Sequence, residues 1–472
     1  GASSGMAMAH WEIQGWMILI LGWVFVPFYT RSMVYTMPEF LERRYNPQSR
    51  TILSVISLVS YVLTKVAVTV YAGGLVFQQV FGIKELWGID FFWIAAIGLV
   101  VLTALYTIFG GMKSVLYTSV LQTPILLLGS LIILVLGFKE LGGWDEMMRV
   151  CGAVTVNDYG DTMTNLIRSN DDANFPWLGA LIGSAIIGFW YWCTDQFIVQ
   201  RVLSGKNEME ARRGTIFGAY LKLLPVFLFL IPGMIAFALH QKYIGADGEG
   251  FLPMLANGTA NADAAFPTLV AKLLPAGVKG LVVCGILAAL MSSLASLFNS
   301  SAMLFTIDFY KRFRPETPEK KLVGIGQVAT VVIVILGILW IPIMRSVGDV
   351  LYTYLQDVQS VLAPGIAAAF LLGICWKRTS AQGGMWGLIA GMVIGLTRLG
   401  AKVYYSNAGE VADSTFKYLF YDMNWLFFCG WMFLFCIIVV IVVSLATKAP
   451  TAEKIQGLVF GTATKEQKAA TR

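Results

Sequence analysis

ALMSSLASLFNSS, residues 289–301, lies inside an apolar run, residues 278–307, that is long enough to cross a bilayer as a helix. Six of its side chains are polar: Ser292, Ser293, Ser296, Asn299, Ser300 and Ser301. Hydroxyl groups at this density gain nothing from contact with lipid. The stretch therefore indicates a membrane helix whose polar face is turned toward the interior of a helix bundle.

The composition of the whole chain is that of a protein with several membrane spans. Of its 472 residues, 57% are hydrophobic and 13% are charged, and the mean hydropathy is +0.70. Soluble domains are about 45–50% apolar and about 25% charged. The six cysteines form no CxxC pair and the only histidines are His10 and His240, so we expect no zinc or thiol-redox site. The sequence shows no nucleophile paired with a general base, so it does not predict an enzyme.

Runs of about 20 apolar residues predict eleven membrane spans. They lie near 11–29, 52–81, 87–109, 115–138, 177–199, 215–240, 278–307, 323–344, 350–375, 382–405 and 424–446. Residues 1–9, GASSGMAMA, would end a further, broken first helix that this chain largely lacks. Twenty-one basic residues lie in one set of alternate loops, including 30–51, and 10 lie in the other set or at the ends of the spans next to it. The positive-inside rule then places 30–51 and the polar tail, 447–472, in the cytoplasm. We expect a single transmembrane domain, 1–446, in the plasma (inner) membrane.

Ionisable and amide side chains within membrane spans are costly and predict functional sites. Those found here are Glu12, Lys65, Asp195, Lys222, Gln356, Asp357 and Arg398. Each also has a purely structural interpretation. Lys65 and Asp195 could be buried partners of each other, and Glu12 could lie at the membrane interface. Gln356 could hold helices together, and Arg398 could reach toward the interface.

The polar stretch itself has the geometry of half a cation site. Residues 289, 292, 293 and 296 are spaced i, i+3, i+4 and i+7, so they share one helix face. The carbonyl of Ala289 would lie close to the hydroxyls of Ser292 and Ser293, and such neutral oxygens suit a monovalent ion better than Mg²⁺. The alternative is a small-residue face that lets helices pack closely. The remaining ligands would come from an unwound helix, for which GASSGMAMA is suited.

Several stretches together resemble the sodium/solute symporter family, and within it the sodium/sugar (glucose/galactose) cotransporter branch. They are YTIFGGMKS (106–114), VYTMPEFL (34–41), WYWCTDQ (190–196), VQR (199–201), SSLAS (292–296) and PGIAAAFLLG (364–373). The resemblance covers about residues 1–380. It implies an all-α fold of two inverted five-helix repeats with broken helices, the first helix largely missing, and extra C-terminal helices.

The resemblance also implies roles for residues already singled out. Sodium, the co-transported ion, would bind the carbonyl of Ala289 and the hydroxyls of Ser292 and Ser293. The side chains implied to bind the hydroxyls of a sugar are Glu12, Lys222 and Gln356, with Tyr191 stacked on its ring as an inner gate. Trp11 and Tyr352 fall where the family has outer-gate aromatic residues.

The expected function is sodium-coupled symport of a glucose- or galactose-like monosaccharide by alternating access within a lipid bilayer, with no nucleic-acid partner. Ser119 stands where the sugar branch usually has an aspartate linked to a second sodium site, so the sodium stoichiometry is not predicted. The sequence also does not rank glucose against galactose. Symport of another small solute, such as inositol, sialic acid or proline, is the first alternative. A channel or membrane sensor is the second.

Overall fold

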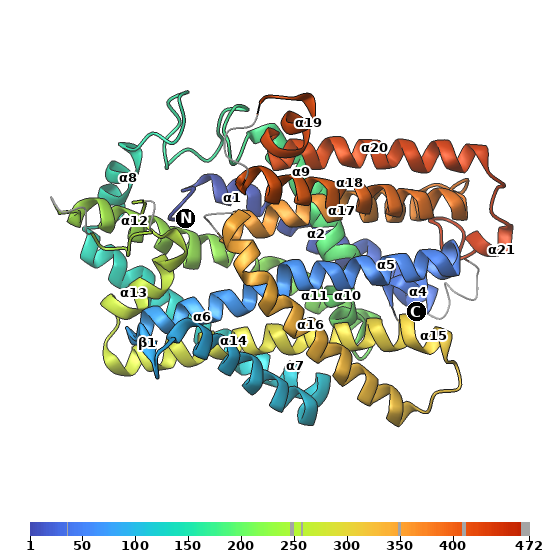
Figure 1. Ribbon diagram of the computed structural model, residues 1–472, viewed down its shortest axis with the longest axis horizontal. Helices are drawn as coiled ribbons and strands as arrows, with labels where there is room; N and C mark the ends of the chain where they lie inside the picture. Colours follow the sequence, from blue (N-terminus) through green and yellow to red (C-terminus); the bar gives the residue numbers. More distant parts are fainter. Residues whose placement is uncertain (35, 246–249, 256–257, 348–350, 408–411, 464–472) are drawn as a thin grey trace.

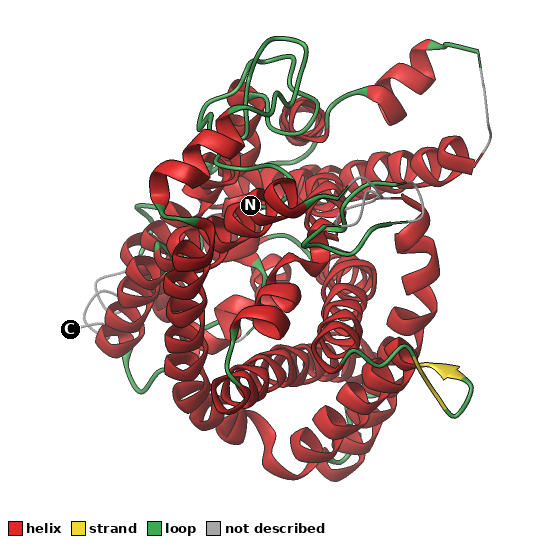
Figure 2. Ribbon diagram, turned by 90° about the vertical axis from the view of Figure 1, so that its left-hand side faces the viewer, coloured by secondary structure: helices red, strands yellow, loops and turns green. Residues whose placement is uncertain are grey.

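The computed structural model describes residues 1–472 except 35, 246–249, 256–257, 348–350, 408–411 and 464–472. Within helices, it does not describe the side chains of residues 106, 108–116, 118–119, 121, 344–347, 352–353 and 407. The chain is a bundle of long helices that run roughly along the longest axis of the molecule (Figure 1). One short hairpin, β1 (Glu85–Leu86) and β2 (Ile89–Asp90), projects from it (Figure 2).

The α-helices follow the apolar runs of the sequence. They are α1 (Ala7–Trp11), α2 (Trp16–Ile20), α3 (Val26–Ser32), α4 (Met37–Arg44), α5 (Pro47–Ser60), α6 (Ala67–Phe81), α7 (Phe91–Leu141), α8 (Trp144–Gly152), α9 (Trp177–Gly188), α10 (Gln196–Leu203), α11 (Glu208–Leu221), α12 (Ile231–Tyr243), α13 (Ala265–Leu273), α14 (Ala276–Met303), α15 (Lys311–Phe313), α16 (Glu319–Val347), α17 (Leu351–Cys375), α18 (Ala381–Asn407), α19 (Thr415–Lys417), α20 (Trp425–Ala446) and α21 (Ala452–Ile455).

Many of these helices are joined end to end by short turns of different pitch. The π-helical turns are η2 (Leu21–Phe25), η3 (Tyr61–Val66), η4 (Phe189–Thr194), η5 (Val226–Leu230), η7 (Leu304–Tyr310) and η8 (Tyr418–Asp422), and the 3₁₀ turns are η1 (Glu12–Gly15) and η6 (Ala262–Ala264). A π turn widens the helix and re-aims the side chains that follow it, and such turns are frequent at functional sites.

The predicted all-helical, multi-span class is confirmed. Among the described residues, ten helical segments are long and apolar enough to cross a membrane, and Phe91–Leu105 is a shorter apolar segment. Together they correspond to the eleven predicted spans. Their mutual packing buries a core that includes Trp11, Tyr61 and Phe370.

The predicted spans 87–109 and 115–138 are both present as apolar segments, Phe91–Leu105 and Gln122–Leu141, but no irregular loop separates them. Helical backbone continues without a break through residues 110–114, so both spans belong to the 51-residue helix α7. The expected loop lay in the gap between the two apolar runs, which contains Lys113 and two glycines. A glycine inside a helix costs only about 1 kcal/mol, which neighbouring packing can offset.

A broken helix does occur in the fifth predicted span. The chain leaves η4 at Asp195, whose backbone is extended at φ −79° and ψ 126°, and α10 begins at the next residue. The carboxylate of Asp195 accepts a hydrogen bond from the backbone N–H of Phe197 at 3.1 Å and so caps α10. The interruption places Tyr191 and Asp195 at the junction of two helices.

The polar tail is more ordered than its composition predicts. Val459 is buried, and the backbone N–H of Phe460 donates to the carbonyl of Ile374 at the end of α17 at 2.9 Å. The ring of Phe460 lies 5.2 Å from that of Phe28 on α3. Three apolar residues in an otherwise polar segment, residues 458–460, are enough to dock it on the bundle.

Candidate functional site

The predicted sodium residues lie together on α14. Ser292 is buried, and Ala289 and Ser293 are half-buried, so the face they share points into the bundle rather than toward lipid. The same helix packs along α7, α16 and α6. Ala289, Ser292 and Ser293 therefore share one helix face, as the spacing predicts, and a sodium site there stays a prediction.

The polar residues that follow on the same helix have a different role. Ser296 donates to the carbonyl of Ser292 at 2.9 Å and receives a hydrogen bond from the guanidinium of Arg201. Ser300 donates to the amide oxygen of Gln200 at 3.3 Å. Arg201 and Gln200 both belong to α10, so these serines attach α14 to the second half of the broken helix.

Glu12 and Lys222 meet in the fold although 210 residues separate them. Glu12 begins η1, directly after α1, and Lys222 ends α11, and their side chains form an ion pair. Neither is fully enclosed, because 15% of the Glu12 side chain and 23% of the Lys222 side chain remain exposed. A carboxylate that accepts and an ammonium that donates are thus held side by side and within reach of a solute.

Gln356 lies in the middle of α17 and is 5% exposed. Its amide oxygen Oε1 is buried and has no hydrogen-bond partner among the described residues. Such an atom costs about 1–3 kcal/mol relative to a satisfied one. Because α17 packs directly against η4, the helix that carries Gln356 adjoins the segment that carries Tyr191.

The residue next to Gln356 anchors α17 to α18. Asp357 forms an ion pair with Lys402 at 2.5 Å and lies 3.7 Å from a guanidinium nitrogen of Arg398. Arg398 does not reach toward the interface: it is 1% exposed and donates to the carbonyl of Met423 at 2.7 Å. The sequence analysis missed Lys402, although its i+4 spacing from Arg398 puts both cations on one face of α18.

Lys65 and Asp195 are partners, as one interpretation of the sequence proposed. Their ion pair is almost completely buried, and Tyr61, one turn before Lys65, donates to the Asp195 carboxylate at 2.9 Å. The ammonium of Lys65 lies 4.9 Å from the centre of the Tyr191 ring. Tyr191 also makes an edge contact with Trp192 at 4.9 Å. The predicted gate residue therefore packs on an ion pair that joins η3 to the break before α10.

The structure gives little evidence on the two predicted outer-gate residues. Trp11 is completely buried, and its ring packs edge-on against Trp425 of α20 at 5.1 Å. The side chain of Tyr352 lies outside the described residues, as does that of Ser119. An outer-gate role for Trp11 and Tyr352 stays a prediction.

A cavity of about 320 Å³ borders Glu12 and is lined also by Phe229, Ala262 and Asp263. The carboxylate of Asp263 accepts from the backbone N–H of Leu351 at 3.0 Å, which caps the start of α17. Burial raises the pKa of Asp263 from 3.8 to about 6, and the bond from Leu351 opposes that rise. Larger cavities line both sides of α16, but Glu12, Tyr191 and Gln356 do not line them.

The comparisons with known proteins agree on one family. A model of the sodium:solute symporter family matches residues 1–391. Sodium/myo-inositol cotransporter 2 of Homo sapiens is 35% identical over 475 residues, which cover 98% of this chain and 69% of that protein. Sodium/glucose cotransporter 1 of Ovis aries is 37% identical over 469 residues, which cover 95% and 69%.

The fold agrees with this result. The solved structure of a Na⁺-coupled sialic acid symporter, in a substrate-bound outward-open state, superimposes with a TM-score of 0.68 at 20% identity, covering 95% of this chain and 88% of that one. The predicted symporter fold and sodium as the transported ion are confirmed, and these relatives are transporters rather than enzymes. The chain belongs to the sodium:solute symporter family.

Proposed function

We propose that this protein uses the sodium gradient to take up a monosaccharide similar to glucose or galactose. Sodium-coupled solute symport follows from the family. The observation that carries the choice of solute is the buried, unpaired amide oxygen of Gln356. A ring hydroxyl that donates to this oxygen would remove its desolvation cost, and a solute that lacks the hydroxyl would leave the cost in place.

The ion pair of Glu12 and Lys222 supplies complementary polar groups. A hydroxyl group both donates and accepts, so it can bridge the carboxylate and the ammonium without leaving either charge unpaired. The aromatic face of Tyr191 suits the apolar carbons of a pyranose ring. We propose that these side chains and Gln356 bind the solute, with Tyr191 closing the site on the inner side.

Sodium is the second substrate. We propose that it binds the carbonyl of Ala289 and the hydroxyls of Ser292 and Ser293, and that it favours the outward-facing state that accepts the solute. One charge that crosses the membrane yields about 2.3 kcal/mol per 100 mV. This energy alone corresponds to about fiftyfold accumulation of a neutral solute, because each 1.4 kcal/mol is a factor of ten.

The distribution of charge supports an orientation in the membrane. The loops that carry the excess of basic residues would face the cytoplasm, together with the segment that follows residue 446. We propose a location in the plasma (inner) membrane and one transport domain over residues 1–446.

A cyclic polyol such as myo-inositol is a second candidate. It presents a ring of hydroxyls to the same acceptors and donors, and the human relative named for myo-inositol is about as similar to this chain as the sheep relative named for glucose. Competition separates the two candidates. Unlabelled glucose and galactose should reduce uptake of labelled glucose at concentrations at which myo-inositol does not, and the reverse result favours the polyol.

The test is uptake of labelled glucose or galactose by the purified protein in sealed vesicles with an inward sodium gradient. We expect accumulation that requires sodium and is lost in the Ser292→Ala/Ser293→Ala double variant and in Gln356→Ala. Ser301→Ala on the same helix is the matched control and should transport normally, because its hydroxyl is buried without a partner among the described residues. Normal transport by both site variants contradicts the site assignment, and a sodium current without solute accumulation indicates a channel.

A further inference from the structure

A long groove lies between α16 and the α5–η3 segment, and none of the proposed solute-binding residues lines it. Its volume is about 790 Å³, within the range of about 300–1,000 Å³ that holds small ligands. Its α16 wall consists of Lys321, Gly324, Ile325, Val328, Ala329, Val332, Ile333 and Leu336. These residues repeat at i, i+3 and i+4 and so form one continuous helix face.

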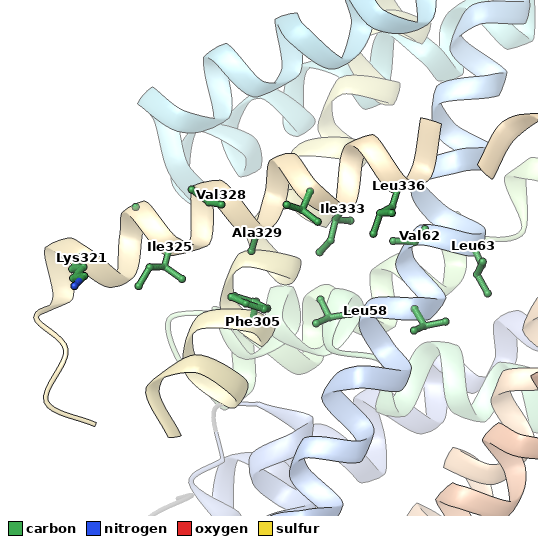
Figure 3. A pocket seen from close by; sticks show the side chains of 13 residues that line it. Leu58, Val62, Leu63, Phe305, Lys321, Ile325, Val328, Ala329, Ile333 and Leu336 are labelled. Atoms are coloured by element: carbon green, nitrogen blue, oxygen red, sulfur yellow. The ribbon is translucent and has the colours of Figure 1, made fainter. Parts of the chain in front are cut away.

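The shape of the groove matches an extended chain rather than a compact metabolite. From Lys321 to Leu336, the wall rises about 22 Å along α16 at 1.5 Å per residue. The hydrocarbon core of a bilayer is about 30 Å thick. Figure 3 shows Lys321 at one end of the groove and Leu336 and Leu63 at the other. A ligand with its head at Lys321 would therefore reach past the middle of the membrane.

Apart from Lys321, every side chain that lines the groove is apolar. Leu58, Val62 and Phe305 form part of the opposite wall. On α16, Val328 is 64% exposed and Leu336 is 48% exposed, so the groove is open to the membrane rather than enclosed by protein. Such a surface favours hydrocarbon, and it offers a polar metabolite no partner along most of its length.

The polar end of the groove is basic. Lys321 is exposed, and the ion pairs among the described residues do not include it. Residues 311–321 contain five basic and two acidic side chains. A single lysine near a membrane surface is worth about 1 kcal/mol toward an anionic headgroup, which corresponds to about a fivefold preference over a neutral one.

We propose that this groove binds one acyl chain of an anionic glycerophospholipid and that Lys321 binds its phosphate headgroup. The back of the groove is the η3 turn. Val62 and Leu63 line the groove, while Tyr61 and Lys65 of the same turn contact Asp195. A bound chain therefore packs against the segment that supports the inner-gate contacts.

A second contact links α16 to the same turn. The indole N–H of Trp340 on α16 donates to the hydroxyl of Tyr354 at 2.5 Å, and that hydroxyl donates to the carbonyl of Leu63 at 3.0 Å. The two walls of the groove are thus bridged beyond its inner end. We expect an occupied groove to hold η3 in place and to raise the transport rate.

Lipid association is measured with the purified protein in phosphatidylcholine vesicles that contain trace phosphatidylglycerol or phosphatidylcholine with a nitroxide on the acyl chain. Electron spin resonance gives the fraction of labelled lipid whose motion the protein restricts. We expect about fivefold stronger association of phosphatidylglycerol. Lys321→Gln should reduce it to the level of phosphatidylcholine, whereas Lys320→Gln, next to it but outside the groove, should retain most of the preference.

A substitution that fills the groove tests the acyl chain independently of charge. A side chain at Gly324 would project into open space, so Gly324→Phe should fold and displace both lipids from the site. Ile335→Phe, on an exposed part of the same helix outside the groove, is its control. The thermal midpoint of each variant shows whether it has folded.

Three results would overturn the proposal. Equal restriction of the two lipids by the unmodified protein excludes headgroup selection. Equal losses in Lys321→Gln and Lys320→Gln indicate diffuse surface charge. Displacement of labelled phosphatidylglycerol by millimolar glycerol phosphate indicates a phosphate site that does not use the groove. These readouts do not depend on transport, so they stand apart from the identity of the solute.

Discussion

Two of the lysine–carboxylate pairs within the bundle, Lys65–Asp195 and Lys222–Glu12, have different surroundings. In the pair of Lys65 and Asp195, 7% and 3% of the side chains are exposed, and Tyr61 and the Phe197 N–H also bond to the carboxylate. In the pair of Lys222 and Glu12, 23% and 15% are exposed, and a cavity borders the carboxylate. The first pair is completed by protein, whereas the second leaves polar capacity for a solute.

This difference separates an ion pair enclosed by protein from the ion pair that we propose binds the solute. Removal of one partner from an enclosed pair leaves an uncompensated charge in a medium of low dielectric. Removal of one partner from a pair that water can reach costs much less in stability. Ionisable residues inside membrane spans therefore do not all have the same role. A pair that is buried and has further protein partners is expected to be structural, whereas a partly exposed pair can bind a solute.

The largest effect is expected from Lys65→Ala. It leaves the Asp195 carboxylate buried without its cation, at a cost of about 3–5 kcal/mol. We expect little folded protein, measured as the yield of monodisperse material and as its thermal midpoint in detergent. Lys65→Arg, which keeps the charge, is the control and should recover part of the loss. A Lys65→Ala protein of normal stability would contradict the structural role of this pair.

Glu12→Gln should have the opposite effect to Lys65→Ala: it should impair transport and leave stability almost unchanged. The amide retains an acceptor but loses the charge, so the solute concentration for half-maximal uptake should rise about tenfold or more, because hydrogen bonds to charged groups contribute about 1.5–3 kcal/mol. The thermal midpoint should change little, since the pair is partly exposed. Uptake measured against solute and against sodium separately checks this result. A loss of stability as large as that of Lys65→Ala would remove the distinction between the pairs.

The sequence predicted some of the contacts between candidate site residues and could not predict others. The spacing of Ala289, Ser292 and Ser293 predicted a shared polar face, because helix periodicity is local. That Glu12 contacts Lys222 could not be predicted, because it depends on how η1 and α11 approach in space. A partner for Lys65 was expected, since an isolated charge within a span is costly, and Asp195 is that partner.

The predicted loop near Lys113 shows that a local sequence preference can also predict the wrong structure. Two adjacent glycines and a lysine are typical of a loop, yet the backbone there is helical. The tail was expected to be polar, but a few apolar residues attach it to α17. In both cases, a local preference of about 1 kcal/mol is smaller than the energy of burial across the bundle.

Gln356→Met should stabilise the protein and impair transport together. The substitution replaces a buried amide oxygen that has no partner among the described residues with an apolar side chain of similar length, so the free energy of unfolding should rise by about 1 kcal/mol. Half-maximal uptake should require about tenfold more solute. Gln359→Met, one turn further on the same buried helix, is the control. A lower thermal midpoint in Gln356→Met would indicate that Gln356 holds helices together instead.

The smallest effect should come from Asp263, which lines the cavity beside Glu12 and caps α17. Its pKa is raised from 3.8 to about 6 by burial, so the folded protein holds this proton more tightly than the unfolded chain does. The stabilising contribution of protonated Asp263 is therefore complete below pH 4 and is lost as the pH rises through 6. After allowance for its partial exposure, we expect the loss to be about 1 kcal/mol.

Asp263→Asn isolates this contribution, because asparagine carries no ionisable group and still accepts a hydrogen bond from the Leu351 N–H. We expect the variant to be more stable than the unmodified protein at pH 7 and equally stable near pH 4. Thermal midpoints of both proteins across this range give the comparison. A variant that is less stable at pH 7 would show that the charged carboxylate is needed for the cap, and it would assign Asp263 to the structural class of carboxylates represented by Asp195.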